Sequence, residues 1–139
     1  MRLDDLLATA EARIARLSPA DAWAAAADST LIVDIRDDGA RERDGVVPAS
    51  IHIPRTVLEW RLDLEGAWHN PHVTADRRLV MLCEHGYSSV LAAAAVADLG
   101  HAAVGDVLGG FDAWREAGLP VTRARPRPSG TLPGMDPPD

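Results

Sequence analysis

The chain has 139 residues, the usual length of one domain and too short for two. Its 14 basic and 21 acidic side chains give a net charge of −7, which excludes a general nucleic-acid binder. No stretch approaches the roughly 20 apolar residues of a membrane span, and the N-terminus lacks the apolar region of a secretion signal. We therefore expect one cytoplasmic domain without nucleic-acid or membrane partners.

The N-terminal part of the chain predicts two helices followed by a buried strand. Apolar residues at spacings of three and four indicate an amphipathic helix over residues 1–17 that packs on the domain. Ser18 and Pro19 are typical of an N-cap and a first helical position, and predict a second helix to about Ala27. The branched apolar run at residues 30–35 predicts a strand buried on both faces.

The middle of the chain alternates short apolar runs with helical patterns. Extended or strand-like runs occupy residues 50–54, 78–83 and 102–108. Helical patterns occupy residues 56–64, 88–100 and 109–120. This alternation predicts parallel strands joined by crossover helices, hence a three-layer α/β domain over residues 18–122. Ligands of such sheets bind beyond the carboxyl ends of the strands.

The last segment, residues 123–139, has a different composition. It contains five of the ten prolines and three arginines, with few apolar residues to bury. We expect it to form a flexible Pro/Arg-rich tail.

The only cysteine, Cys83, ends the predicted strand 78–83 and begins the loop "CEHGYSS". Gly86 allows the positive φ that a sharp strand-to-helix turn needs. If the loop curls around the sulfur, the amides of residues 84–89 and the next helix N-terminus stabilise a thiolate or a persulfide. A free cysteine after an apolar strand is equally often a buried core residue. The local pattern leaves both interpretations open, and a lone cysteine excludes an internal disulfide.

Three segments together resemble the signatures of the rhodanese homology domain. "LIVDIRDDGARERDGVVPASIHIP" is similar to its first signature, "CEHGYSS" to its active-site loop and "LGGFDAWREAGLPV" to its closing signature, in the same order and spacing. The resemblance covers about residues 17–121. It implies a three-layer rhodanese-like fold with a five-stranded parallel sheet flanked by helices.

The resemblance also implies a sulfurtransferase that needs no cofactor. Cys83 would take a sulfane sulfur from thiosulfate or a persulfide and pass it to cyanide, a thiol or a protein acceptor. The sulfur would be held by the loop residues Glu84, His85, Gly86, Tyr87, Ser88 and Ser89.

The loop departs from the common pattern Cys-x-x-Gly-x-Arg-Ser, because Ser88 stands where the arginine is expected and Glu84 adds a negative charge. Both changes weaken the binding of a dianion such as thiosulfate and raise the pKa of Cys83 relative to relatives with the arginine. We therefore expect Arg55 or Arg61 to lean over the pocket and replace the missing guanidinium. The alternative is a catalytically weak rhodanese-fold module that binds, carries or senses sulfur.

Two other functions are disfavoured. Cysteine phosphatases that resemble rhodaneses need an arginine six positions after the cysteine to clamp the phosphoryl group, and this chain has Ser89 there. His69 and His72 are separated by Pro71 and have no second cysteine nearby, so we expect no zinc or other metal site. We expect His52 to be a structural residue near the end of the sheet.

The surroundings of the loop give two further expectations. Asp34 and Arg36 lie at the end of the first predicted strand, where the rhodanese signature uses such a pair to tie the turn to the domain. Arg36 is expected to form a structural ion pair with Glu42 or Asp44. Tyr87 and Trp60 are expected to form walls of the pocket.

Overall fold

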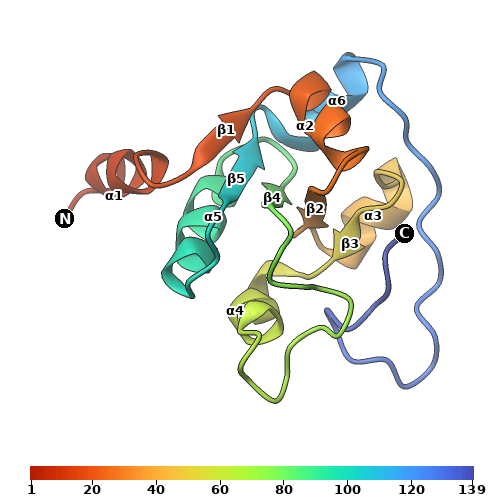
Figure 1. The fold of residues 1–139 in the computed structure, drawn as a ribbon. Coiled ribbons are helices and arrows are strands. Elements are labelled where there is room, and N and C mark those ends of the chain that lie inside the picture. Colours follow the sequence, from red (N-terminus) through yellow and green to blue (C-terminus); the bar gives the residue numbers. More distant parts are fainter.

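Five parallel strands form the central layer of the structure, a computed structural model that describes residues 1–139 (Figure 1). The strands are β1 (Ala15–Leu17), β2 (Leu31–Asp34), β3 (Ile51–His52), β4 (Leu79–Leu82) and β5 (Val104–Val107). Their order across the sheet is β1-β5-β4-β2-β3, and all four neighbouring pairs are parallel. The five-stranded parallel sheet is confirmed, and β4 lies at its centre.

Helices cover both faces of the sheet. They are α1 (Leu3–Glu11), α2 (Pro19–Ala26), α3 (Asp38–Asp44), α4 (Leu58–Leu62), α5 (Ser88–Asp98) and α6 (Gly110–Glu116), with a 3₁₀ turn η1 (Arg55–Val57) before α4. One apolar core contains side chains of α4 and α5, and the other contains side chains of α2 and α6. Adjacent residues of β2 and β4 enter opposite cores, which explains why these strands are continuously apolar.

The N-terminal segment differs from the helix expected over residues 1–17. Helix α1 ends at Glu11, and residues 15–17 form the edge strand β1, which pairs with β5. Ile14 packs against one core and Leu17 against the other. A separation of three places residues on opposite faces of an extended chain but on one face of a helix. The spacing of Ile14 and Leu17 is therefore compatible with a helix and with a strand. The segment forms a strand because it pairs with β5.

Helix α3 lies in a segment for which the sequence predicted no helix. The Asp37 side chain accepts a hydrogen bond from the Ala40 amide at 2.8 Å, which caps the helix. Arg41 and Arg43 lie in its last turn, where they complement the helix dipole. Helix α3 contains few apolar residues, so no helical spacing of apolar residues could predict it.

Residues 123–139 contain no helix or strand, but they lie against the domain. In Figure 1 this segment descends past α3 to the loop after α4 and returns to α3. The Arg61 Nε donates to the Pro133 carbonyl at 2.8 Å, and the Asn70 side chain donates to the Gly134 carbonyl at 2.7 Å. This differs from the expected flexible tail, because the buried polar groups of Arg61 and Asn70 find their acceptors in its backbone.

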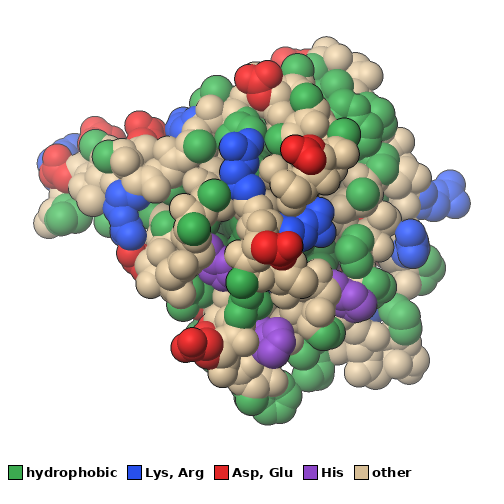
Figure 2. Space-filling model, in the orientation of Figure 1, with side chains coloured by type: hydrophobic (Ala, Val, Ile, Leu, Met, Phe, Trp, Pro, Cys, Tyr) green, Lys and Arg blue, Asp and Glu red, His purple; other side chains and the backbone are tan.

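The face of the molecule shown in Figure 2 carries charges of both signs. On the face seen in Figure 2, arginine and acidic side chains are interspersed and form no continuous basic area. None of the helices has the length and apolar composition needed to cross a membrane.

Removal of residues 126–139 tests whether the tail contributes to stability. We expect the free energy of unfolding to fall by roughly 2–5 kcal/mol, because each lost hydrogen bond contributes about 1 kcal/mol. Urea denaturation of both chains measures the difference. Arg125→Ala is the matched control, since Arg125 is exposed, and it should unfold like the wild type. Equal stability of the shortened and full-length chains would show that the tail is loosely attached.

Candidate active site

Cys83 lies directly after the central strand β4, at the carboxyl end of the sheet. Its side chain is largely buried. The loop turns back at Gly86, whose φ is +84°, and the Gly86 amide donates a hydrogen bond to Cys83 Sγ at 3.1 Å. Helix α5 begins two residues later at Ser88. The sulfur therefore lies inside the turn.

Three carbonyl groups of this loop are bound by donors outside it. The Phe111 amide donates to the Cys83 carbonyl at 2.8 Å, and the Asp112 amide donates to the Glu84 carbonyl at 3.1 Å. The Arg16 Nη2 donates to the Gly86 carbonyl at 3.0 Å. In a trans peptide the N–H points opposite to the C=O. The amides that share these three peptide units are therefore directed away from α6 and Arg16.

Two glycines allow α6 to approach the loop. A Cβ on Gly110 would lie 2.5 Å from the Cys83 carbonyl oxygen, and a Cβ on Gly86 would lie 2.6 Å from the Gly109 nitrogen. Both distances are far below van der Waals contact, so no larger residue fits without displacing the backbone. Gly110 of the closing motif and Gly86 of the loop therefore allow the first amides of α6 to bond the carbonyls of the cysteine loop.

Opposing effects set the pKa of Cys83. Burial raises the pKa of the thiol, but hydrogen bonds from the Ser89 and Ser88 hydroxyls and from the Ser89 and Gly86 amides hold it below its ordinary value. The Ser89 hydroxyl has one proton, which it donates to Asp106 Oδ2 at 2.7 Å. While that bond is made, Ser88 and the two amides are the remaining donors to the sulfur. A lowered pKa increases the thiolate fraction near neutral pH.

A cavity of about 470 Å³ opens over Cys83. The charged side chains that line it are Arg36, Asp37, Arg43, Arg55 and Glu84. Ser88 also lines the cavity, whereas Gly86 and Ser89 lie behind its surface. Three arginines against two carboxylates make the cavity suitable for an anion.

Arg36 is buried beside Cys83 and is held by several partners. It forms a two-pronged pair with Asp34, with distances of 3.0 and 2.9 Å, and its guanidinium lies 3.8 Å from the centre of the Phe111 ring. Its Nη1 has no hydrogen-bond partner and lies 3.6 Å from the Glu84 carboxylate. Arg36 therefore offsets the negative charge of Glu84 next to the sulfur. The expected partners Glu42 and Asp44 were wrong, because Asp34 lies within direct reach at the end of β2.

Comparison with known proteins gives the family. The model of the rhodanese-like domain matches residues 18–117. The chain belongs to the rhodanese-like domain family. It is 32% identical over 101 residues to the thiosulfate sulfurtransferase GlpE of Pseudomonas syringae, which covers 72% of this chain and 86% of that protein.

Solved structures of relatives show the same fold. A protein of unknown function from Rhodopseudomonas palustris, described as a possible tyrosine phosphatase, is 37% identical, with a TM-score of 0.81 over 88% of this chain and 95% of that chain. A rhodanese-related protein from Thermoplasma volcanium is 25% identical, with a TM-score of 0.65 over 77% and 96% of the two chains.

Of the two arginines expected to replace the loop guanidinium, the structure brings one to the cavity. Arg55 lines it, although its Nη1 bonds Glu59 at 2.7 Å. Arg61 does not line it, because its guanidinium is buried against the carbonyls of Trp68 and Pro133. The prediction for Arg61 is therefore wrong, and the reason is its structural role beneath the tail.

The exposed loop side chains lie outside the cavity. The His85 Nδ1 lies 2.7 Å from the Asp112 carboxylate, and this bond is the main cause that lowers the pKa of Asp112. Tyr87 is 78% exposed and does not line the cavity. The imidazole and the phenol therefore point to solvent, and only the backbone of these residues belongs to the loop that holds the sulfur.

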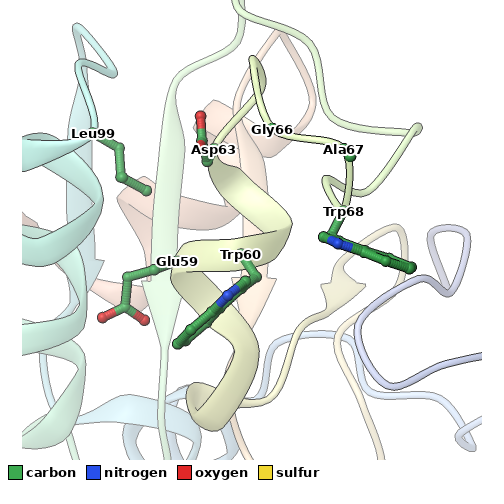
Figure 3. A pocket seen from close by; sticks show the side chains of 7 residues that line it. All are labelled: Glu59, Trp60, Asp63, Gly66, Ala67, Trp68 and Leu99. Atoms are coloured by element: carbon green, nitrogen blue, oxygen red, sulfur yellow. The ribbon is translucent and has the colours of Figure 1, made fainter.

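Trp60 belongs to a different hollow, of about 240 Å³, beside α4 (Figure 3). Its indole and that of Trp68 extend in different directions there, and Leu99, the residue after α5, lines the same hollow. The expectation that Tyr87 and Trp60 wall the cysteine pocket is wrong. The helical pattern of the segment did not show which face of α4 turns toward Cys83.

No part of the chain gathers three side chains suited to a metal ion. The His69 ring bonds the Gly66 carbonyl at 2.7 Å. His52 is buried with its Nε2 at 2.7 Å from the Arg36 carbonyl, and burial lowers its pKa, as suits a neutral structural histidine. Its structural role is confirmed.

The sequence interpretation missed two residues that contact the loop, Arg16 and Asp106. Asp106 is fully buried within β5, and a carboxylate inside an apolar strand was the available signal. Arg16 gave no such signal in the sequence, because its segment was assigned to a helix.

Gly110→Ala tests the seat of the loop on α6, with Gly118→Ala as the matched control. Both positions have positive φ, +63° and +70°, so each alanine costs about 1 kcal/mol through the backbone alone. Only at Gly110 does the added Cβ collide, while Gly118 has no atom within 4 Å. We expect Gly110→Ala to lose more stability in urea denaturation and to slow alkylation of Cys83. Equal behaviour of the two variants would contradict this role of Gly110.

Proposed function

We propose that this protein is a sulfurtransferase that moves a sulfane sulfur from thiosulfate or a persulfide to a thiophilic acceptor through a persulfide on Cys83. The observation that carries the proposal is the position of the Cys83 sulfur, inside the amide turn and beneath a cavity with three arginines. The similarity to a thiosulfate sulfurtransferase supports the same reaction class.

The first step uses Cys83 as a nucleophile. Its thiolate attacks the outer sulfur of thiosulfate, the S–S bond of the donor breaks, and sulfite leaves with the bonding electron pair. The lowered pKa favours this step, because the thiolate is the reactive form. The cationic side chains of Arg36, Arg43 and Arg55 stabilise the charge of the donor and of the departing sulfite.

The second step releases the sulfur. The acceptor, cyanide or a thiolate, attacks the terminal sulfur of the persulfide, and Cys83 leaves as a thiolate. Amides that stabilise a negative sulfur lower the energy of this leaving group. The Gly86 amide is placed for that function, because it already bonds Sγ in the free protein. A cavity of about 470 Å³ admits a donor or acceptor larger than a small inorganic anion.

A sulfur carrier or sensor with little turnover is the second candidate. Ser88 in place of the loop arginine favours it, since the loop itself has no cation, and Arg55 is paired with Glu59 in the free protein. Phosphatase activity, the possibility attached to the relative from Rhodopseudomonas palustris, is disfavoured in this chain. The position that needs a clamping arginine is Ser89, which is buried and bound to Asp106.

Replacement of Cys83 by serine tests the proposed chemistry. We expect the wild type to form thiocyanate from thiosulfate and cyanide, and Cys83→Ser to form none, because an alcohol at this position is not ionised and holds no sulfane sulfur. Mass spectrometry after exposure to thiosulfate should show one added sulfur atom in the wild type only. An adduct without turnover would favour the carrier, and equal turnover in both proteins would remove Cys83 from the mechanism.

Arg55→Ala tests the anion-binding role of the cavity mouth. We expect the KM for thiosulfate to rise about three- to tenfold with a smaller change in kcat, because one exposed cation near an anion contributes about 1 kcal/mol. Arg77→Ala is the control, since its guanidinium bonds the carbonyls of Ser29 and Thr30 and does not line the cavity. An unchanged KM in Arg55→Ala would exclude Arg55 from donor binding.

A further inference from the structure

The guanidinium of Arg16, a residue of the edge strand β1, contacts the cysteine loop on the side away from the cavity. Arg16 lies in β1, and its Nη2 donates to the Gly86 carbonyl at 3.0 Å. The same Gly86 donates its own amide to Cys83 Sγ. One residue of the loop is therefore held between Arg16 and the sulfur. Arg16 precedes residues 18–117, the part of the chain that the family model matches.

A buried carboxylate fixes the position of Arg16. Strands β1 and β5 pair with Arg16 opposite Asp106, and the two side chains form a fork-to-fork pair with distances of 2.9 and 3.0 Å. Asp106 is fully buried, whereas the Arg16 side chain is 27% exposed. This two-point geometry allows one orientation of the guanidinium plane, which leaves its Nη2 beside the Gly86 carbonyl.

The same carboxylate holds the start of α5. The Ser89 hydroxyl, also fully buried, donates to Asp106 Oδ2 at 2.7 Å. Ser89 closes the loop that Cys83 opens, so Asp106 and Arg16 contact this loop at two points, its turn at Gly86 and its end at Ser89. The structural elements that meet here, β1, β5 and α5, are far apart in the sequence.

We propose that Arg16 is a positioning residue of the sulfur-transfer site, which acts with Asp106 to hold the loop at its turn, Gly86, and at its end, Ser89, in the form that binds a negative sulfur. This inference rests on the proposed function for its effect on turnover, but its effect on Cys83 itself is independent of turnover.

Several charged groups besides Arg16 surround Cys83 and can influence its pKa. On the cavity side these are Arg36, Asp37, Arg43, Arg55 and Glu84, and behind the loop they are Arg16 and Asp106. On its outer side the loop carries His85, which is paired with Asp112 of α6. Hydrogen bonds to Asp106 raise the pKa of Arg16 against its partial burial, and a Cys83 thiolate raises it further. The coupling is reciprocal, so Arg16 favours the thiolate.

The test is the pH dependence of Cys83 alkylation by iodoacetamide, which reports one site because the chain has one cysteine. We expect Arg16→Met to raise the pKa of Cys83 by about one unit and to slow alkylation near neutral pH about tenfold. The sign follows because the loss of a cation and of the Gly86 carbonyl donor disfavours the charged form. We expect kcat/KM for sulfur transfer to fall by a similar factor.

Arg13→Gln is the matched control. Arg13 belongs to the same N-terminal segment and also pairs with an aspartate, Asp98 of α5, but it contacts no residue of the cysteine loop. The Arg13→Gln substitution changes the net charge by the same amount as Arg16→Met. We expect its alkylation profile to coincide with that of the wild type. A shift in Arg13→Gln as large as in Arg16→Met would assign the effect to net charge or to loosening of the segment, and would overturn the proposal.

A second variant keeps the test decisive if Arg16→Met does not fold, because it leaves Asp106 unpaired. Arg16→Lys keeps a cation beside Asp106 but lacks the planar fork that holds the carboxylate and the Gly86 carbonyl together. We expect an intermediate pKa of Cys83 and an intermediate kcat/KM. A wild-type profile in Arg16→Lys, or in folded Arg16→Met, would overturn the positioning role. Absence of sulfur transfer in the wild type would instead refute the proposed function and leave the alkylation result valid.

Discussion

The orientation of the peptide units in the cysteine loop is the constraint on which the candidate site depends. A peptide unit that directs its carbonyl outward directs its amide to the other side. Here the carbonyls of Cys83, Glu84 and Gly86 are bound by α6 and by Arg16. The loop needs no charge of its own to favour an anionic sulfur, because the rest of the domain determines where its dipoles point. This explains why contacts behind the loop matter as much as those in the cavity.

The sequence predicted those parts of the fold that depend on local patterns. The N-cap at Ser18 follows from short-range geometry, and it is present in the structure. The edge strand β1 was not predicted, because its assignment depends on hydrogen bonds to β5, about ninety residues away. The tail was interpreted from composition, whereas its position depends on the unmet hydrogen bonds of Arg61 and Asn70.

The sequence likewise predicted only part of the candidate site. Cys83 and its loop were found because the chemistry and the turn are contiguous in the sequence. The ion pairs were not predicted with the partners that the structure shows. Arg36 was expected to pair with a residue of the next helix, yet it bonds Asp34, two positions away. Arg16 meets Asp106 only through the register of two strands.

These pairs give the site an approximate symmetry about the central strand. Asp34 ends β2 on one side of β4, and Asp106 lies in β5 on the other side. Each aspartate is fully buried and holds an arginine, and each arginine reaches the loop, Arg36 near Glu84 and Arg16 at Gly86. Because each guanidinium is largely neutralised by its own carboxylate, the pairs change the net charge near the sulfur little. Their main effect is geometric, because on one side Arg16 bonds the Gly86 carbonyl at the turn of the loop and Asp106 accepts from the Ser89 hydroxyl at its end.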